Sequence, residues 1–181
     1  MLPVLSGRIV LILTSGSMLI IILGLPGTGK TYFAQRLAGE LKVPHFSTGQ
    51  VRTELHLKGH HTRAAKQIVY NQLLIKAILE LDAHPVVIVD ATFGERDRRD
   101  QFGRAMVRKQ QPLFMIEIVA EETIIRERVS RDREANFGAY LKMVQQFEPL
   151  ADDEPHLTLD SGQQSPEAMV SQALSYLAVS P

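Results

Sequence analysis

Short apolar runs alternate along the chain with longer stretches in which apolar residues recur every three or four positions. The first pattern is typical of buried strands and the second of amphipathic helices. Strands are predicted at residues 19–23, 44–47, 86–90, 113–119 and 156–159. Helices are predicted at 30–41, 49–57, 63–83, 95–109, 121–133, 137–147 and 166–177. Because strands and helices alternate, we expect an α/β fold in which crossover helices join parallel strands.

The sequence GLPGTGKT, residues 24–31, lies between the first predicted strand and the first predicted helix. Its spacing, G-x-x-x-x-G-K-T, is that of a phosphate-binding loop. Glycines let several backbone N–H groups point into one concavity, and the helix adds its positive N-terminal end. We therefore expect ATP to bind Gly27, Thr28, Gly29, Lys30 and Thr31. Lys30 would contact the β- and γ-phosphates, and Thr31 would offer a hydroxyl to Mg²⁺.

Asp90 ends a predicted strand that is apolar on both faces, as a central parallel strand should be. The carboxyl ends of parallel strands are where α/β sheets bind ligands. We expect Asp90 to hold Mg²⁺ together with Thr31, or to orient an attacking hydroxyl. The alternative is an aspartate that only caps the following turn.

Two groups of arginines follow, in ERDRR (95–99) and RERVSRDR (126–133). Phosphoryl transfer depends mainly on positioned cations around the transferring group. We expect Arg128 and Arg131, with Arg133 as a third candidate, to belong to a short arginine-rich lid that closes on the ATP phosphates. The alternative is that these side chains lie on solvated helix faces, paired with neighbouring acids.

Composition narrows the class of protein. The 181 residues are 45% hydrophobic and 22% charged, as in an ordinary single globular domain. The lack of cysteine excludes a disulfide framework and a thiol nucleophile, and it fits a cytoplasmic protein. The formal net charge of zero indicates neither an extended nucleic-acid surface nor attraction to an anionic membrane.

The N-terminal residues 1–17 do not fit the alternation of strands and helices. Residues 9–23 read IVLILTSGSMLIIIL, but TSGS interrupts the run, so neither half can span a membrane, and the second half leads directly into the glycine loop. Taken alone, the TSGS sequence between the two apolar runs predicts a hairpin between residues 9–13 and 19–23. Since the strand before a phosphate loop normally has both edges paired, we instead predict an extension at 1–17 outside the sheet and a domain at 18–181. Deleting the extension should leave nucleotide binding intact.

Nearly the whole chain from Met18 resembles a family of P-loop kinases, the AAA-domain or ATP-binding kinases, which are related to bacteriophage polynucleotide kinase and zeta-toxin kinases. The shared segments are GLPGTGKT, FSTGQVRTEL, VVIVDATFGERDRR, RERVSRDR and YLKMVQQFEPL. The resemblance implies a three-layer P-loop NTPase fold with strand order 2-3-1-4-5. It also implies transfer of the ATP γ-phosphate to a hydroxyl of a small molecule or of a nucleotide or polynucleotide end, with Arg52 holding this acceptor.

One position departs from the family pattern. FSTGQVR usually reads S-S-D-x-x-R in that family, and the aspartate serves as the base for the acceptor hydroxyl. Gly49 stands at that position here, and Gln50 cannot accept a proton at neutral pH. Asp90 could act as the base instead, the acceptor could be a phosphate that needs no base, or the protein could have lost transfer and kept only ATP binding or hydrolysis.

The segment His45–Gly49 also resembles the H-I-S-T-G segment of adenylate kinases, which lines a nucleoside monophosphate pocket. The aspartate and the arginine that normally follow there are not matched. A hydroxyl-acceptor kinase is therefore favoured, and a nucleoside monophosphate kinase and a non-kinase switch or ATPase stay open. The histidines of LHLKGHHT (55–62) are expected in an acceptor-side loop, and the acids at 152–154 in a solvated loop. The sequence identifies neither the acceptor nor the oligomeric state.

Overall fold

The computed structural model describes residues 7, 9, 12, 16–131 and 137–178. Among these residues, five parallel strands form one sheet in the order β2-β3-β1-β4-β5, as expected. The strands are β1 (Met18–Leu23), β2 (His45–Ser47), β3 (Val86–Asp90), β4 (Leu113–Val119) and β5 (His156–Asp160). The helices are α2 (Lys30–Leu41), α3 (Thr48–Glu54), α4 (Arg63–Glu80), α5 (Arg96–Lys109), α6 (Glu122–Arg131), α7 (Phe137–Gln146) and α8 (Pro166–Ala178).

The predicted elements are confirmed, and most differ from the structure only at their ends. Helix α3 ends at Glu54 rather than at residue 57, because His56 has a φ of 54°, which no helix can continue through. Helix α4 ends at Glu80, and residues 81–83 form a turn instead of its predicted last turn. The end of the predicted helix 121–133 lies outside the described residues beyond Arg131.

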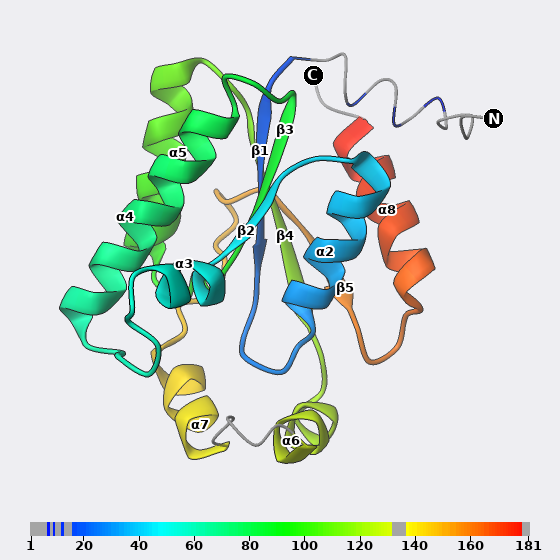
Figure 1. Cartoon of the computed structure of the whole chain (residues 1–181). Coiled ribbons are helices and arrows are strands. Elements are labelled where there is room, and N and C mark those ends of the chain that lie inside the picture. The colour runs from blue at the N-terminus through cyan, green and yellow to red at the C-terminus, as the bar shows by residue number, and fades with distance from the viewer. Residues whose placement is uncertain (1–6, 8, 10–11, 13–15, 132–136, 179–181) are drawn as a thin grey trace.

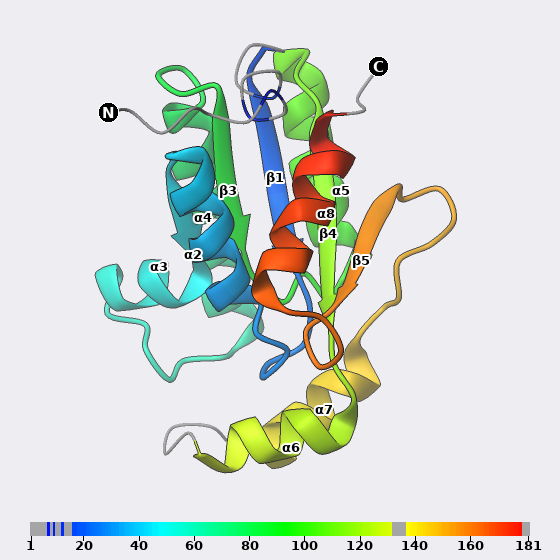
Figure 2. The same cartoon turned by 90° about the vertical axis from the view of Figure 1, so that its right-hand side faces the viewer.

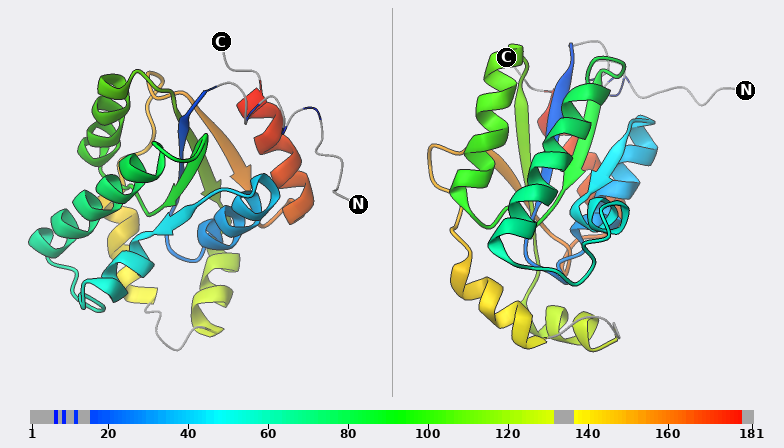
Figure 3. Two further views of the ribbon diagram at one scale, coloured as in Figure 1. Left: turned by 45° about the horizontal axis from the view of Figure 1, so that its top comes forward. Right: turned by 60° about the vertical axis from the view of Figure 1, so that its left-hand side comes forward.

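Helices cover both faces of the sheet, which makes three layers. Helices α2 and α8 lie on one face, and α4 and α5 lie on the other (Figures 1 and 3). Helices α6 and α7 lie beyond the carboxyl ends of the strands (Figure 2). The carboxyl edge of the sheet therefore faces these two short helices.

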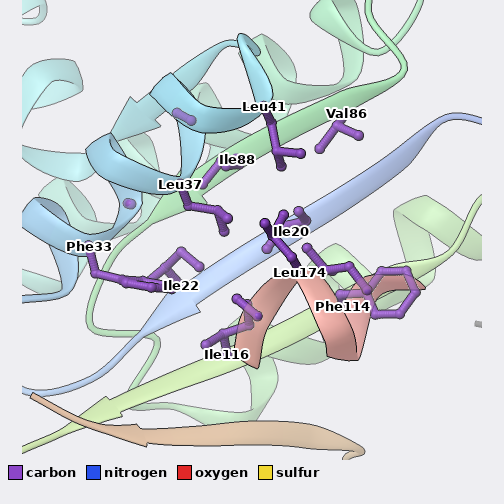
Figure 4. Close-up of a cluster of buried hydrophobic side chains, with 14 of the residues drawn as sticks. Ile20, Ile22, Phe33, Leu37, Leu41, Val86, Ile88, Phe114, Ile116 and Leu174 are labelled. Atoms are coloured by element: carbon purple, nitrogen blue, oxygen red, sulfur yellow. The ribbon is translucent and has the colours of Figure 1, made fainter. Parts of the chain in front are cut away.

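Strand β1 is fully buried because both of its faces are covered. Ile20 and Ile22 point toward α2 and α8, where they meet Leu37 and Leu174 (Figure 4). The alternate residues of β1 pack with α4 and α5 on the opposite face. This is why the strand reads as a continuous apolar run. Burial on both faces fixes the strand's position, and with it the start of the glycine loop at Gly24.

The strand register brings three chain segments to one point. Ile22 of β1 is paired with Asp90 of β3, and Ser47 of β2 is paired with the same aspartate. The glycine loop, Asp90 and the start of α3 consequently lie side by side at the carboxyl edge of the sheet. This is the usual ligand-binding edge of an α/β sheet.

Both edges of β1 are occupied, by β3 and by β4, so the hairpin between residues 9–13 and 19–23 does not form. Most of the predicted extension 1–17 lies outside the described residues. Ile9 and Ile12 are described, and both are buried in the cluster formed with α2 and α8. None of the described helices combines the length and apolar character needed to cross a bilayer.

Candidate functional site

The glycine loop adopts a conformation that its sequence makes possible. Gly24, Gly27 and Gly29 have φ values of 147°, 81° and 91°, in the region that side chains disfavour. A Cβ atom at Gly24 would collide with the carbonyl oxygen of Ile118, and one at Gly27 would lie 2.9 Å from Cγ2 of Ile125. Glycine is therefore required at these positions both by backbone conformation and by space.

Lys30 begins α2, and its Nζ lies 3.4 Å from the carbonyl oxygen of Leu25, across the loop. Burial lowers the pKa of Lys30, and the negative charge of Asp90 partly opposes that shift. The ammonium group thus faces the concavity of the loop. This is the position that a side chain needs in order to contact phosphate oxygens.

Asp90 lies at the centre of a hydrogen-bonded trio. The hydroxyl of Thr31 donates to Oδ1 of Asp90 at 2.7 Å, and Nε2 of His45 lies 2.6 Å from Oδ2. The aspartate is 2% exposed, so its charge depends on these partners. Thr31 and Asp90 meet as expected for two residues that would hold Mg²⁺. The sequence placed His45 only in the wall of a pocket. Its position at the start of the strand next to the one that Asp90 ends could have indicated their contact.

Arg128 reaches the glycine loop from α6. One guanidinium nitrogen donates to the carbonyl oxygens of Gly27 and Thr28, each at 3.2 Å, and to Ser161 Oγ at 2.9 Å, and the other donates to Ser161 O at 3.0 Å. Arg128 is therefore next to the phosphate site, as expected for a lid residue, but it bonds to the loop's backbone. Arg131 ends α6, and its side chain and all of residue Arg133 lie outside the described structure.

Apolar contacts hold α6 and α7 against the loop. Ile125, Val129 and Tyr140 form a small buried cluster, and Leu25 of the glycine loop packs against it. Beside Arg128, a cavity of about 340 Å³ opens between Gly29, Phe33 and Met169. Its partly apolar wall and its position next to the loop suit the base of a nucleotide.

A second pocket, of about 170 Å³, lies between α3, α4, α5 and α7, and its wall includes Thr92, two residues after Asp90. It adjoins the glycine loop, because the N–H of Gly24 bonds to the carbonyl oxygen of Thr92 in the pocket wall at 3.4 Å. Its charged and polar side chains are Thr48, Arg52, His61, Lys66, Tyr70, Thr92, Glu95, Arg98 and Gln146. Arg52, the predicted acceptor residue, lies in the wall of this pocket. No pattern in the sequence marked Lys66 or Glu95 as pocket residues. Nothing in the sequence distinguished Arg98 from Arg96 and Arg99.

The segment around Gly49 is organised by a helix cap. Ser47 Oγ accepts from the N–H of Gln50 at 3.1 Å, and the Gln50 side chain accepts from the N–H of Ser47 at 2.9 Å. This reciprocal capping box explains both residues without catalysis. A Cβ at Gly49 would make only an ordinary contact with Ser47, so space does not exclude an acid there.

The three arginines of ERDRR differ in their partners. Arg99 is buried and forms a bidentate pair with Glu154, at 2.6 and 3.0 Å, whereas Arg96 pairs with exposed Asp153. The prediction that residues 152–154 form only a solvated loop is thus wrong for Glu154, because Arg99 draws its carboxylate inside. The described residues contain no group of three or more histidine or acidic side chains that could hold a metal, which includes the histidines of residues 55–62.

Together, the fold and the site define a P-loop nucleotide-binding protein: a glycine loop after a central strand, with a lysine, a threonine and a strand-end aspartate around it. A sequence-family model described as "AAA domain" matches residues 19–150. The chain belongs to this family. A comparison with curated proteins gives no match.

Solved structures with this fold include several kinases. A sugar kinase from Janibacter sp. is 22% identical with a TM-score of 0.71, over 91% of this chain and 96% of that one. A gluconokinase from Sinorhizobium meliloti is 16% identical with a TM-score of 0.70, over 90% and 91% of the two chains. The Mycobacterium tuberculosis APS kinase CysC, in complex with AMPPNP and APS, is 16% identical with a TM-score of 0.70, over 90% and 98%. At these identities the comparison shows the fold.

Proposed function

We propose that the protein is an ATP-dependent phosphotransferase that moves the γ-phosphate to an acceptor hydroxyl. The observation that carries this proposal is the placement of Asp90. It bonds to Thr31 of the glycine loop on one side, and it lies at the strand end that leads to the pocket containing Arg52 on the other. The end of β3 thus connects the glycine loop, which Asp90 meets through Thr31, with a separate polar pocket, whose wall includes Thr92. The kinases with this fold, and the bound AMPPNP and APS in one of them, support the same interpretation.

Each residue has a part in the proposed transfer. Lys30 neutralises the β- and γ-phosphates, and Gly27, Thr28 and Gly29 cradle them through backbone N–H groups. Mg²⁺, held by Thr31 and Asp90, would offset further phosphate charge. Arg128 and Arg131 would stabilise the charge of the transition state. The cavity beside Gly29 would take the adenine.

The chemistry is a displacement at phosphorus. The acceptor oxygen forms a bond to the γ-phosphorus, and the bond from that phosphorus to its bridging oxygen breaks, with the electron pair leaving on ADP. The hydroxyl proton passes to Asp90, the candidate base near the loop. Glu95 is the second candidate base, because it is the one carboxylate among the described residues that line the pocket. Glu95→Gln separates the two: an unchanged kcat supports Asp90, and a fall of about 100-fold identifies Glu95 as the base.

Lys30→Ala tests the central claim. We expect loss of both ATP binding and transfer, because the variant lacks the cation that faces the loop. ATP affinity is measured by calorimetry, and ADP formation is measured with and without a panel of alcohols. Lys42→Ala, which removes an exposed lysine just after α2, is the matched control. Normal turnover in Lys30→Ala would contradict the proposal.

The same assay distinguishes the other candidates. ADP formation that needs no acceptor would indicate an ATPase or switch, and a phosphoanhydride product from a nucleoside monophosphate would indicate a nucleoside monophosphate kinase. The relation to polynucleotide kinase and zeta-toxin kinases, and a cytoplasmic location, are likewise proposals. They rest on the shared sequence segments and on the cysteine-free composition.

A further inference from the structure

The pocket beside Asp90 has an uneven balance of charge. Arg52, Lys66 and Arg98 supply three cations to its wall, and Glu95 supplies the one carboxylate among the described lining residues. This imbalance is local, since the whole chain has equal numbers of acidic and basic residues. The described lining residues of the pocket therefore carry an excess of positive charge.

The hydrogen bonds of the two arginines support this interpretation. Arg52 donates to the carbonyl oxygen of His60 at 2.6 Å, and Arg98 donates to the amide oxygen of Gln67 at 2.6 Å. Both acceptors are neutral. Arg98 also lies over the ring of Tyr70, and its one carboxylate partner in the described part of the chain, Glu95, is 3.7 Å away and 48% exposed. These contacts fix the guanidinium groups in place without cancelling their charge.

The neighbouring arginines show what neutralised cations look like in this protein. Arg96 and Arg99 lie on the same helix as Arg98, and each has a close carboxylate partner, Asp153 or Glu154. Arg98 is 7% exposed, so its charge is nearly as buried as that of Arg99. A buried cation whose described carboxylate partner is 3.7 Å away and half exposed is costly unless something else supplies further negative charge. A ligand in the pocket can supply it.

We propose that the phosphoryl acceptor carries a fixed anionic group, a phosphate or a carboxylate, which Lys66, Arg98 and Arg52 bind while a hydroxyl of the same molecule faces Asp90. Planar guanidinium groups recognise such oxyanions through paired hydrogen bonds, and a lysine adds a point charge. His61 also lines the wall, and burial together with the charges of Arg52 and Lys66 lowers its pKa. The inference rests on the proposed transfer function and names the class of its acceptor.

The kinetic test uses two series of acceptors that share a carbon skeleton and compare a neutral member with a carboxylate and a phosphate: glycerol, glycerate and glycerol 3-phosphate, and glucose, gluconate and glucose 6-phosphate. We expect kcat/KM to favour the anionic members over the neutral one in at least one series. Lys66→Gln should reduce that preference about tenfold or more, the usual effect of losing one charged hydrogen bond. Lys66→Arg should restore it. Arg108→Gln removes a cation at the opposite, exposed end of α5 and should leave the preference unchanged.

A binding measurement separates this inference from the proposed function. Sulfate and the four anionic acceptors are titrated by calorimetry into protein saturated with Mg·AMPPNP, so that the glycine loop is already filled. Anion binding that weakens in Lys66→Gln, but not in Arg108→Gln, supports the pocket even if ADP formation proves independent of any acceptor. Transfer to neutral and charged acceptors with equal kcat/KM would overturn the inference and leave the kinase function standing. No anion binding at millimolar concentrations, or binding indifferent to Lys66, would also overturn it.

Discussion

At the scale of single residues, Asp90 connects the two halves of the site. Its two oxygens bond to Thr31 and His45, which belong to α2 and β2, and the aspartate itself ends β3. A buried carboxylate with two partners keeps a defined orientation. That orientation is what a metal ligand or a positioned base needs, because small displacements of reacting groups cost large factors in rate.

Asp90→Asn tests this role. We expect transfer to be abolished while ATP affinity stays measurable, because the amide keeps the shape but loses the charge that holds Mg²⁺ and takes the proton. Single-turnover transfer and ATP affinity are measured on the same preparation. Asp97→Asn, an exposed substitution in the first turn of α5, serves as the control. Wild-type transfer in Asp90→Asn would remove the assigned role.

At the scale of elements, the short helices α6 and α7 act on the glycine loop by packing. Gly27 is in contact with Ile125 and Val129 of α6, and Arg128 from the same helix bonds to the loop's carbonyl oxygens. Movement of α6 therefore has to change the surroundings of the loop. The described contacts between α6 and the loop are therefore apolar packing as well as the hydrogen bonds of Arg128.

Gly27→Ala tests the contact between α6 and the loop. We expect weaker ATP binding and a lower free energy of unfolding, by about 1–2 kcal/mol, because alanine at a φ of 81° is strained and its Cβ meets Ile125. Gly103→Ala, in the middle of α5 with no atom near the added Cβ, should instead be neutral or stabilising. Urea unfolding and ATP calorimetry distinguish the two. Unchanged ATP affinity in Gly27→Ala would show that the loop tolerates displacement of α6.

At the scale of the whole molecule, Arg99 and Glu154 join segments that are 55 residues apart. Arg99 also donates to the carbonyl oxygens of Phe93 and Glu148, so one guanidinium ties the loop after β3 to the segment that follows α7. The pocket wall thus depends on a buried ion pair. Removal of one partner would leave the other charge buried and unpaired, which is strongly destabilising.

Glu154→Gln should lower the free energy of unfolding at neutral pH by about 3 kcal/mol. The hydrogen bond from Arg99 lowers the pKa of Glu154 against the opposing effect of burial. Its stabilisation is therefore complete above the ordinary glutamate pKa of 4.5 and is lost as the pH falls through the lower folded value.

Urea unfolding between neutral and acid pH checks this prediction. The difference in stability between wild type and Glu154→Gln should shrink as the pH falls below about 4.5. Asp153→Asn, which removes the exposed carboxylate next to it, should change stability little. A difference that stays constant with pH would show that the charge of Glu154 is not what stabilises the wall.

The sequence by itself determined the order of elements, the class of fold and the nucleotide half of the site. These follow from local patterns: the apolar period of strands and helices, and glycines that only a tight loop requires. The loop residues Gly27 to Thr31 and the strand-end Asp90 could be named for this reason. Their meeting at one sheet edge follows from the parallel order of the strands.

Only the tertiary structure decided the pocket that Arg52 and Arg98 line. Arg98 and Arg99 are adjacent in sequence, but successive helix residues point about 100° apart, so one enters the pocket and the other a buried ion pair. Glu154 and His45 find their partners across 55 and 45 residues, where no local pattern connects them. A pocket built from such contacts has no signature along the chain, because its charge balance depends on which side chains the packing turns toward each other.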